Sequence, residues 1–232
     1  MQIPIYINIS PFYYTAKMNV LIHVANSSHL QYSQEICDLI FVSAQARGTG
    51  IAKRSPEYIE EKMNTGKSVI ALDGDILVGF SYIETWGHKK FVANSGLIVH
   101  PDYRGMGFAK KIKQRIFDLS KTLYPESKIF SITTGLAVMK MNSDLGFKPV
   151  TFSELTDDKE FWKGCQTCKN FDILQRNDYK MCLCTGLLYD PTQEEPPAKK
   201  QVSPAVQRKP FAGKIVKPIA KKRNSNRKNK IK

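Results

Sequence analysis

The sequence lacks an apolar run long enough to cross a bilayer, and it lacks the features of a secretory signal peptide. No stretch approaches the roughly 18 apolar residues that a spanning helix needs. Residues 1–17 are apolar and aromatic, but they contain Pro4 and Pro11, and they have neither a basic start nor a small-residue cleavage motif. We therefore expect no membrane partner and a cytoplasmic location. We assign no function to an N-terminal extension, residues 1–18, in which Met18 is an alternative start.

The sequence also has little net charge outside its C-terminal end. Residues 191–232 carry 13 of the 35 Lys and Arg residues and two of the 21 Asp and Glu residues, which gives this segment a net charge of +11 and leaves +3 for the other 190 residues. Its Pro, Lys, Asn and Gln content is typical of a disordered tail. We expect the tail to attract nucleic acid only non-specifically, at low ionic strength. The nearly neutral body disfavours a basic peptide as a partner.

Cysteine is scarce: the chain has five, and four of them fall within 20 positions. Such clustering favours a metal site over a disulfide framework. Two pairs, spaced C-x2-C and C-x-C, would supply four soft ligands for a tetrahedral structural zinc ion: Cys165, Cys168, Cys182 and Cys184. The alternative is free buried thiols packed against three aromatic residues, Phe161, Trp162 and Phe171. A redox dithiol is disfavoured, because no Trp-Cys-Gly-Pro-like run is present.

Apolar periodicity predicts ten elements between residues 19 and 151. In chain order they are a strand at 19–25, helices at 29–46 and 55–63, strands at 68–72, 76–85 and 91–99, a helix at 108–119, a strand at 128–133, a helix at 136–145 and extended chain at 147–151. In the helix at 108–119, apolar residues follow one face, and the other face carries a polar set: Lys110, Lys111, Lys113, Gln114 and Arg115. This order predicts an α/β fold with a mixed, mostly antiparallel sheet flanked by helices. A Cys-rich extension, residues 152–190, follows this domain.

The segment Val99–Ala109 carries the strongest signal for chemistry. It places a strand end, a proline, two glycines and a helix start in that order. Glycines let backbone N–H groups approach a ligand closely, and a helix N-terminus offers unpaired donors and partial positive charge. Arg104 adds a cation that can contact phosphate oxygens in a fork. The pattern predicts a pyrophosphate-binding loop. The alternative is an ordinary glycine turn at the start of a core helix.

This segment resembles the signature of the GNAT superfamily of acetyl-CoA-dependent N-acetyltransferases, Arg/Gln-x-x-Gly-x-Gly/Ala after a strand that ends Leu-x-Val-x-Pro. The resemblance covers residues 19–151, and the later motif Leu145-Gly146-Phe147 belongs to it. It implies that acetyl-CoA is held largely by backbone groups. The pyrophosphate would be bound by the amides of Gly105, Met106, Gly107, Phe108 and Ala109. The pantetheine arm would pair with Leu97, Ile98 and Val99, and one amide there would polarise the thioester carbonyl.

The chain departs from the family pattern where an acid is expected. Family members often carry a tyrosine in the helix before Leu-Gly-Phe, and this tyrosine protonates the leaving thiolate. Asn142 stands at the matching position. Its amide is no acid at neutral pH, but it can hydrogen-bond the sulfur or the pantetheine. Either the thiolate leaves unassisted, which a thiol pKa of about 8.5 permits, or another tyrosine assists: Tyr82, Tyr179 or Tyr189.

The carboxylate that the family often has just before Leu-x-Val is also missing. Three other residues stand there: Asn94, Ser95 and Gly96. We predict Glu84 as the general base, because a carboxylate near aromatic side chains can have its pKa raised toward the working range. The alternative is that Glu84 is a surface charge of the hairpin, paired with Lys89 or Lys90. His100 and His88 are rival bases.

The resemblance implies an enzyme that moves the acetyl group of acetyl-CoA to a primary amine of a small molecule, and an amino acid such as glutamate is one acceptor of this class. We expect the extension, residues 152–190, to fold over the acceptor side and shape the amine pocket. The alternative function is a non-catalytic module that senses acyl-CoA and contacts RNA or a partner through its basic tail. The missing tyrosine and carboxylate favour that alternative.

Overall fold

The computed structural model describes residues 18–47 and 54–193. Its strands and helices are β1 (Val20–Val24), α1 (Ser33–Arg47), α2 (Pro56–Asn64), β2 (Ser68–Asp73), β3 (Ile76–Trp86), β4 (Phe91–Val99), α3 (Phe108–Leu123), β5 (Lys128–Thr133), α4 (Leu136–Asp144), β6 (Lys148–Val150), α5 (Lys159–Lys163), α6 (Phe171–Arg176) and β7 (Thr185–Tyr189). All ten elements predicted for residues 19–151 are present. The expectations for residues 1–17 and for the basic tail beyond residue 193 lie outside the described residues.

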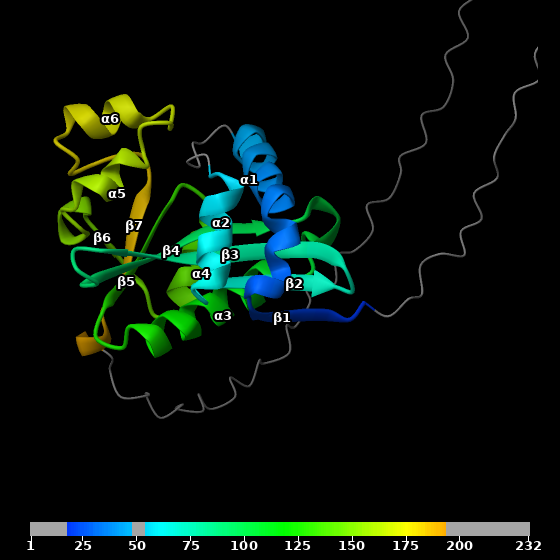
Figure 1. The fold of residues 1–232 in the computed structure, drawn as a ribbon. Helices are drawn as coiled ribbons and strands as arrows, with labels where there is room; N and C mark the ends of the chain where they lie inside the picture. The colour runs from blue at the N-terminus through cyan, green and yellow to red at the C-terminus, as the bar shows by residue number, and fades with distance from the viewer. Residues whose placement is uncertain (1–17, 48–53, 194–232) are drawn as a thin grey trace, which may run out of the picture. The chain divides into compact units, whose positions relative to one another are not determined.

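The strands form one seven-stranded sheet in the order β1-β2-β3-β4-β5-β7-β6 (Figure 1). Neighbouring strands are antiparallel except β4 and β5, which are parallel. The β2–β3 hairpin turns at Gly74, whose φ of 60° suits glycine. The mixed, mostly antiparallel α/β fold predicted from the sequence is therefore confirmed.

Each face of the sheet buries its own set of side chains. On one face, α1 and α2 pack on alternate residues of the central strands, among them Ile70, Phe80 and Tyr82. On the other face, α3 packs on the intervening residues, among them Val69, Ala71 and Ile83. This alternation is the period of two that a strand covered on both sides requires.

The extension contributes a strand that the sequence analysis did not anticipate. β7 lies between β5 and β6, so Lys148–Val150 pairs with the sheet only through Thr185–Tyr189. The helices α5 and α6 lie on the same side of the sheet as α1 and α2, over its β5 and β7 end (Figure 1). Trp162 and Leu174 are buried there against Phe130 of β5. The extension therefore completes the same sheet that carries the predicted motifs.

One expectation about α3 is wrong. Lys113 was placed on the polar face, but its side chain is buried, with 2% of the residue exposed. The reason is that α3 packs on more than the sheet. A second stripe of the helix, containing Lys113, Phe117 and Ser120, faces the core as well, and Phe117 packs against the ring of Phe147. Every helix within residues 18–47 and 54–193 is too short or too polar to cross a bilayer.

Candidate active site

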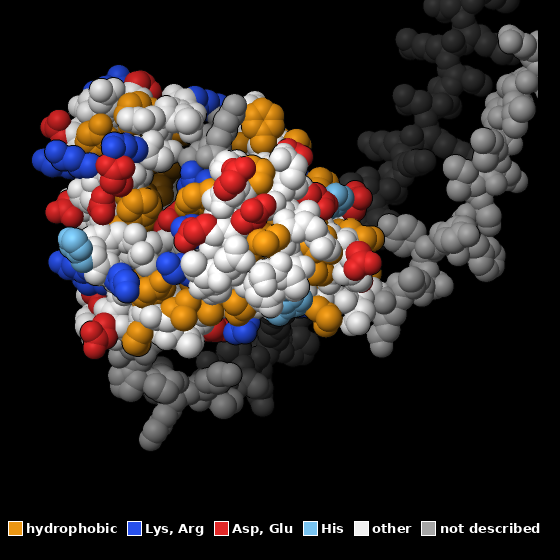
Figure 2. Space-filling model, in the orientation of Figure 1, with side chains coloured by type: hydrophobic (Ala, Val, Ile, Leu, Met, Phe, Trp, Pro, Cys, Tyr) orange, Lys and Arg blue, Asp and Glu red, His pale blue; other side chains and the backbone are white. Residues whose placement is uncertain are grey.

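A cleft of about 680 Å³ opens where β4 and β5 part. The two strands pair at three positions only, Phe91–Ala93 with Lys128–Phe130. Beyond Ala93, within the described residues, β4 is paired with β3 alone. Because the strands separate there, side chains from both faces line the cleft: Glu84 and Tyr58 from one face, and Asn94 and Lys113 from the other. Figure 2 shows the surface hollowed between the α5–α6 region and α1–α2.

β4 leads from this cleft to the predicted pyrophosphate loop. Gly105 and Gly107 have φ angles of 79° and 84°, in the left-handed region that glycine adopts without strain. Gly107 is the N-cap of α3 and makes no side-chain capping bond. Within the described part of the chain, the N–H groups of residues 105–107 donate no hydrogen bond to protein. The loop and the first turn of Phe108 and Ala109 thus present a row of open donors at the positive end of a helix.

Arg104 is fixed at the root of this loop. Its Nε donates to the carbonyl oxygen of Val99 at 3.1 Å, and its guanidinium donates to Ser43 Oγ on α1 at 3.2 Å. These contacts tie the end of β4 to α1. In this structure, therefore, Arg104 braces the loop, and its forked phosphate contact stays a prediction.

The β4 segment that lines the cleft is bent. The β3–β4 register shifts between the pairs Phe80–Ile98 and Tyr82–Ser95. Gly96 has a φ of 64°, and a Cβ at that position would lie 2.2 Å from the Tyr82 ring. Only glycine fits this bulge. Beyond it, the edge of Leu97, Ile98 and Val99 away from β3 has no strand partner among the described residues. That edge is free to pair with an extended ligand.

Glu84 lies in the cleft on the α2 face of the sheet. Its side chain is 11% exposed, and its carboxylate is 3.5 Å from Lys62 Nζ. Burial raises the pKa of Glu84 to about 7, although the nearby Arg54 guanidinium opposes the shift. The predicted alternative partners were wrong, because the cation beside Glu84 comes from α2 and not from the hairpin. A carboxylate that titrates near neutrality inside a cleft has the properties of a general base.

The cleft and the glycine loop lie in a part of the chain that matches a known protein family. Residues 54–137 match the model of the acetyltransferase (GNAT) family. That range contains β4, the glycine loop, Glu84 and most of the cleft. The match indicates a GNAT acetyltransferase domain at residues 54–137.

Solved structures with the same fold agree with this assignment. N-acetylglutamate synthase from Neisseria gonorrhoeae, complexed with coenzyme A and N-acetyl-glutamate, is 19% identical with a TM-score of 0.53, over 74% of this chain and 35% of that one. Diaminobutyrate acetyltransferase from Paenibacillus lautus, with L-2,4-diaminobutyric acid and coenzyme A, is 10% identical with a TM-score of 0.52, over 77% and 99%. The protein yncA from Salmonella typhimurium, with its cofactor acetyl-CoA, is 13% identical with a TM-score of 0.53, over 78% and 99%.

This chain spans about a third of the length of the N-acetylglutamate synthase it resembles. A search of curated proteins found no match to the sequence. At these identities, the solved structures establish the GNAT fold.

The helix α4 carries a buried polar residue. Asn142 is fully buried, and neither its Oδ1 nor its Nδ2 has a hydrogen-bond partner among the described residues. Its backbone carbonyl accepts the N–H of Phe147 at 3.1 Å, which fixes the turn after the helix. A buried amide without partners is costly. The side chain does not line the cleft, and its predicted contact with the cofactor stays a prediction.

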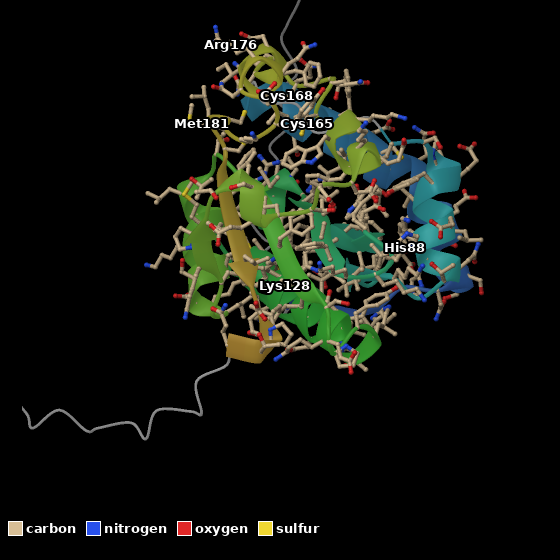
Figure 3. The ribbon with its side chains drawn as sticks, turned by 90° about the vertical axis from the view of Figure 1, so that its left-hand side faces the viewer. His88, Lys128, Cys165, Cys168, Arg176 and Met181 are labelled. Carbon is tan, nitrogen blue, oxygen red and sulfur yellow. The ribbon has the colours of Figure 1, made fainter. Side chains whose placement is uncertain are left out.

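The other sequence-predicted acids and bases are dispersed. Of the three tyrosines, Tyr82 lines the cleft, and its hydroxyl accepts the Nε–H of Arg54 at 2.7 Å. Tyr179 lines a separate cavity beside α5, and Tyr189 packs on Phe117 in the core. Neither His100 nor His88 lines the cleft. His88 lies in the β3–β4 turn (Figure 3).

The four clustered cysteines line the cleft from the extension side. All four are free thiols, and three of them pack in the apolar cluster with Phe161, Trp162 and Phe171. Burial, and after it the neighbouring cysteines, raises the pKa of Cys165 to about 11 and that of Cys184 to about 12. Figure 3 labels Cys165 and Cys168, which lie close together in the extension.

These four cysteines are the predicted zinc ligands. Within residues 18–47 and 54–193, no group of three or more His, Cys, Asp or Glu side chains is placed to hold a metal ion. Three of the thiols pack against the aromatic rings named in the alternative, but all four side chains are half-buried and not fully buried. The zinc prediction for Cys165, Cys168, Cys182 and Cys184 stays a prediction without support from the described structure.

Sequence reasoning missed two groups in the cleft. Arg54 contacts both Tyr58 and Tyr82, with its guanidinium 5.0 Å from the centre of the Tyr58 ring. Lys113 reaches the cleft from α3, where its Nζ donates to Asn94 Oδ1 at 3.1 Å. For Lys113 the available signal was its spacing with Phe117 and Ser120, a second stripe at i, i+4 and i+7.

Proposed function

We propose that this protein is an acetyl-CoA-dependent N-acetyltransferase that acetylates a primary amine of a small molecule. One observation carries the proposal. A cleft opens through the sheet where β4 leaves β5, with a loop of open backbone donors after it and a buried carboxylate of raised pKa inside it. The GNAT family match over residues 54–137 supports the same activity.

Backbone groups of the protein make most of the contacts with the cofactor. The N–H groups of residues 105–109 donate to the pyrophosphate, and the α3 dipole adds to the attraction. The pantetheine arm pairs with the free edge of Leu97, Ile98 and Val99. It extends toward Asn94, next to the last β4–β5 pair at Ala93. A backbone N–H in that segment donates to the thioester oxygen and stabilises the oxyanion as it forms. Asn142 supplies a further polar contact from α4.

The acceptor enters from the face of the sheet that carries Glu84. The Glu84 carboxylate takes a proton from the acceptor's ammonium group and leaves a neutral amine. The amine attacks the thioester carbonyl and forms the C–N bond while the C–S bond breaks. The proton that the attacking nitrogen then loses goes to the departing thiolate, so the products are the acetylated amine and free coenzyme A. Alignment of the two substrates in one cleft supplies much of the acceleration.

We assign the acceptor to the amino acids and related small amines, with glutamate as one candidate. Arg54 and Lys163 line the cleft on the acceptor side and give cationic contacts for a carboxylate. The similarity in fold to an N-acetylglutamate synthase and a diaminobutyrate acetyltransferase supports this class. The walls of the amine pocket come partly from the extension, since Phe161 and the four cysteines line the cleft.

The competing function is the non-catalytic acyl-CoA sensor. The observation in its favour is Asn142, which stands where a proton donor is expected and finds no protein partner. Its nucleic-acid-binding tail lies outside the described residues, and the cytoplasmic location also stays a prediction.

Incubation of the full-length protein with acetyl-CoA and a panel of amino acids and amines separates the two functions. An enzyme releases free thiol in proportion to acceptor and yields a product heavier by about 42 Da, the mass of an acetyl group replacing hydrogen. Glu84→Gln should abolish most of this turnover, by about 10²–10⁴-fold. The matched control is Glu61→Gln, because Glu61 is the other carboxylate beside Lys62, at 2.8 Å, and it lies outside the cleft lining. Tight binding of acetyl-CoA without acceptor-dependent thiol release would support the sensor.

A further inference from the structure

The cleft contains a buried amine that the proposed reaction does not use. Lys113 is 2% exposed, and burial is the cause that lowers its pKa to about 7. No carboxylate forms an ion pair with it in the described part of the chain. Its surroundings are the Asn94 carboxamide and the face of Phe147, whose centre is 5.0 Å from Nζ. A large share of Lys113 is therefore uncharged at neutral pH, the form in which an amine is a nucleophile.

A chain of hydrogen bonds orients this amine. Ser120 Oγ donates to the carbonyl oxygen of Ile116 at 2.8 Å, and Asn94 Nδ2 donates to Ser120 Oγ at 2.8 Å. The Asn94 carboxamide is thereby held with Oδ1 toward Lys113 Nζ, at 3.1 Å. The neutral amine uses one N–H for this bond, and its lone pair remains available.

The position of Lys113 matters because of the direction of β4. The strand runs from its last pairing with β5, at Ala93, to the pyrophosphate loop after Val99. A cofactor held by its pyrophosphate at the loop therefore places its thioester end toward Asn94. Lys113 is bonded to Asn94 and lines the same cleft, on the face of the sheet opposite Glu84.

We infer that Lys113 is a self-acetylation site that accepts the acetyl group of the bound thioester. This inference rests on the proposed binding of acetyl-CoA. Nζ attacks the carbonyl carbon and forms the amide C–N bond, while the C–S bond breaks. The proton lost by Nζ goes to the departing thiolate, so the products are an acetylated lysine and free coenzyme A. The product amide is neutral and keeps an N–H for Asn94, which suits a buried position with no counter-charge.

The test uses the full-length protein with acetyl-CoA and no acceptor, followed by intact mass and peptide mapping. We expect up to one acetyl group per chain, at Lys113, with Lys110 and Lys111 of the same helix labelled at least about tenfold less. Lys113→Met should lose that label. An activated acetyl ester without coenzyme A is the control, and it should label Lys110 and Lys111 first, because solvent-facing amines meet a soluble reagent more readily.

Two results would overturn the inference. Acetyl-CoA that binds by calorimetry while Lys113 stays unmodified rejects the self-acetylation and leaves the proposed function intact. Equal labelling of Lys110, Lys111 and Lys113 assigns the label to solution chemistry and rejects it too. Absence of any acetyl-CoA binding would reject both the inference and the proposed function. Because the decisive observation is on the wild-type chain, it does not depend on the folding of Lys113→Met.

Discussion

Replacement of Glu84 by Gln should raise stability and abolish activity together. The pKa of Glu84 rises from 4.5 to about 7 on folding, so the folded protein holds this proton more tightly than the unfolded chain does. Stability that Glu84 contributes at low pH is therefore lost as pH rises from about 4.5 through about 7. A pKa shift of this size lowers the free energy of unfolding by about 3 kcal/mol between low and high pH. Gln has nearly the same shape and does not titrate, so the variant avoids the loss.

The assay is urea unfolding of the wild type and Glu84→Gln at several pH values between 4.5 and 8. All other titrating groups are common to both proteins, so the difference in their free energies of unfolding isolates Glu84. We expect this difference to move in favour of the variant by about 3 kcal/mol across the range. Glu61→Gln should show no such trend, because the Glu61 side chain is half exposed.

The same variant tests the chemistry. In the wild type, kcat/KM should rise with pH through about 7 as the Glu84 carboxylate forms. In Glu84→Gln, this rise should disappear along with most of the activity. A free-energy difference that stays flat with pH would refute the burial argument. A variant that keeps wild-type activity would refute the assignment of the base.

Three other substitutions test separate parts of the account. Gly107→Ala should weaken acetyl-CoA binding by about 1–3 kcal/mol in calorimetry, whereas Gly74→Ala, which imposes a similar left-handed strain in the β2–β3 turn, should leave binding unchanged. Asn142→Leu should stabilise the free protein by about 1–3 kcal/mol in urea unfolding, because it removes two buried atoms without partners, and should weaken acetyl-CoA binding. Phe161→Ala, which removes a ring 4.9 Å from that of Phe130, should raise the acceptor KM several-fold in steady-state kinetics and leave acetyl-CoA affinity unchanged; a change in cofactor affinity alone would contradict it.

The sequence predicted the elements whose signals are local. The helix α3 and the hairpin at Gly74 follow from apolar spacing and turn residues within a few positions. β7 was missed because its five residues carry little pattern of their own, and its place between β5 and β6 depends on pairing with strands far away in the chain. Such long-range pairing is set by the whole sheet and not by the segment.

In the candidate site, too, features with a local sequence signal could be predicted and features that depend on long-range contacts could not. The loop at Gly105 and Gly107 could be predicted, because glycine spacing records a backbone conformation directly. Glu84 could be predicted as a candidate, but its cation Lys62 could not, because that contact joins α2 to β3. The apolar spacing of α3 predicted one buried face and placed Lys113 on the exposed side. Its burial could not be predicted, because it depends on Phe147, which follows α4 in the chain.

The claim on which the account depends is that backbone N–H groups after β4 hold the diphosphate of a thioester cofactor. Calorimetry with the full-length protein should compare acetyl-CoA with acetyl-pantetheine, which carries the same thioester arm without the diphosphate. We predict that acetyl-CoA binds one per chain and that acetyl-pantetheine binds at least about tenfold more weakly. Equal affinity for the two compounds, or no heat with either, would contradict the account.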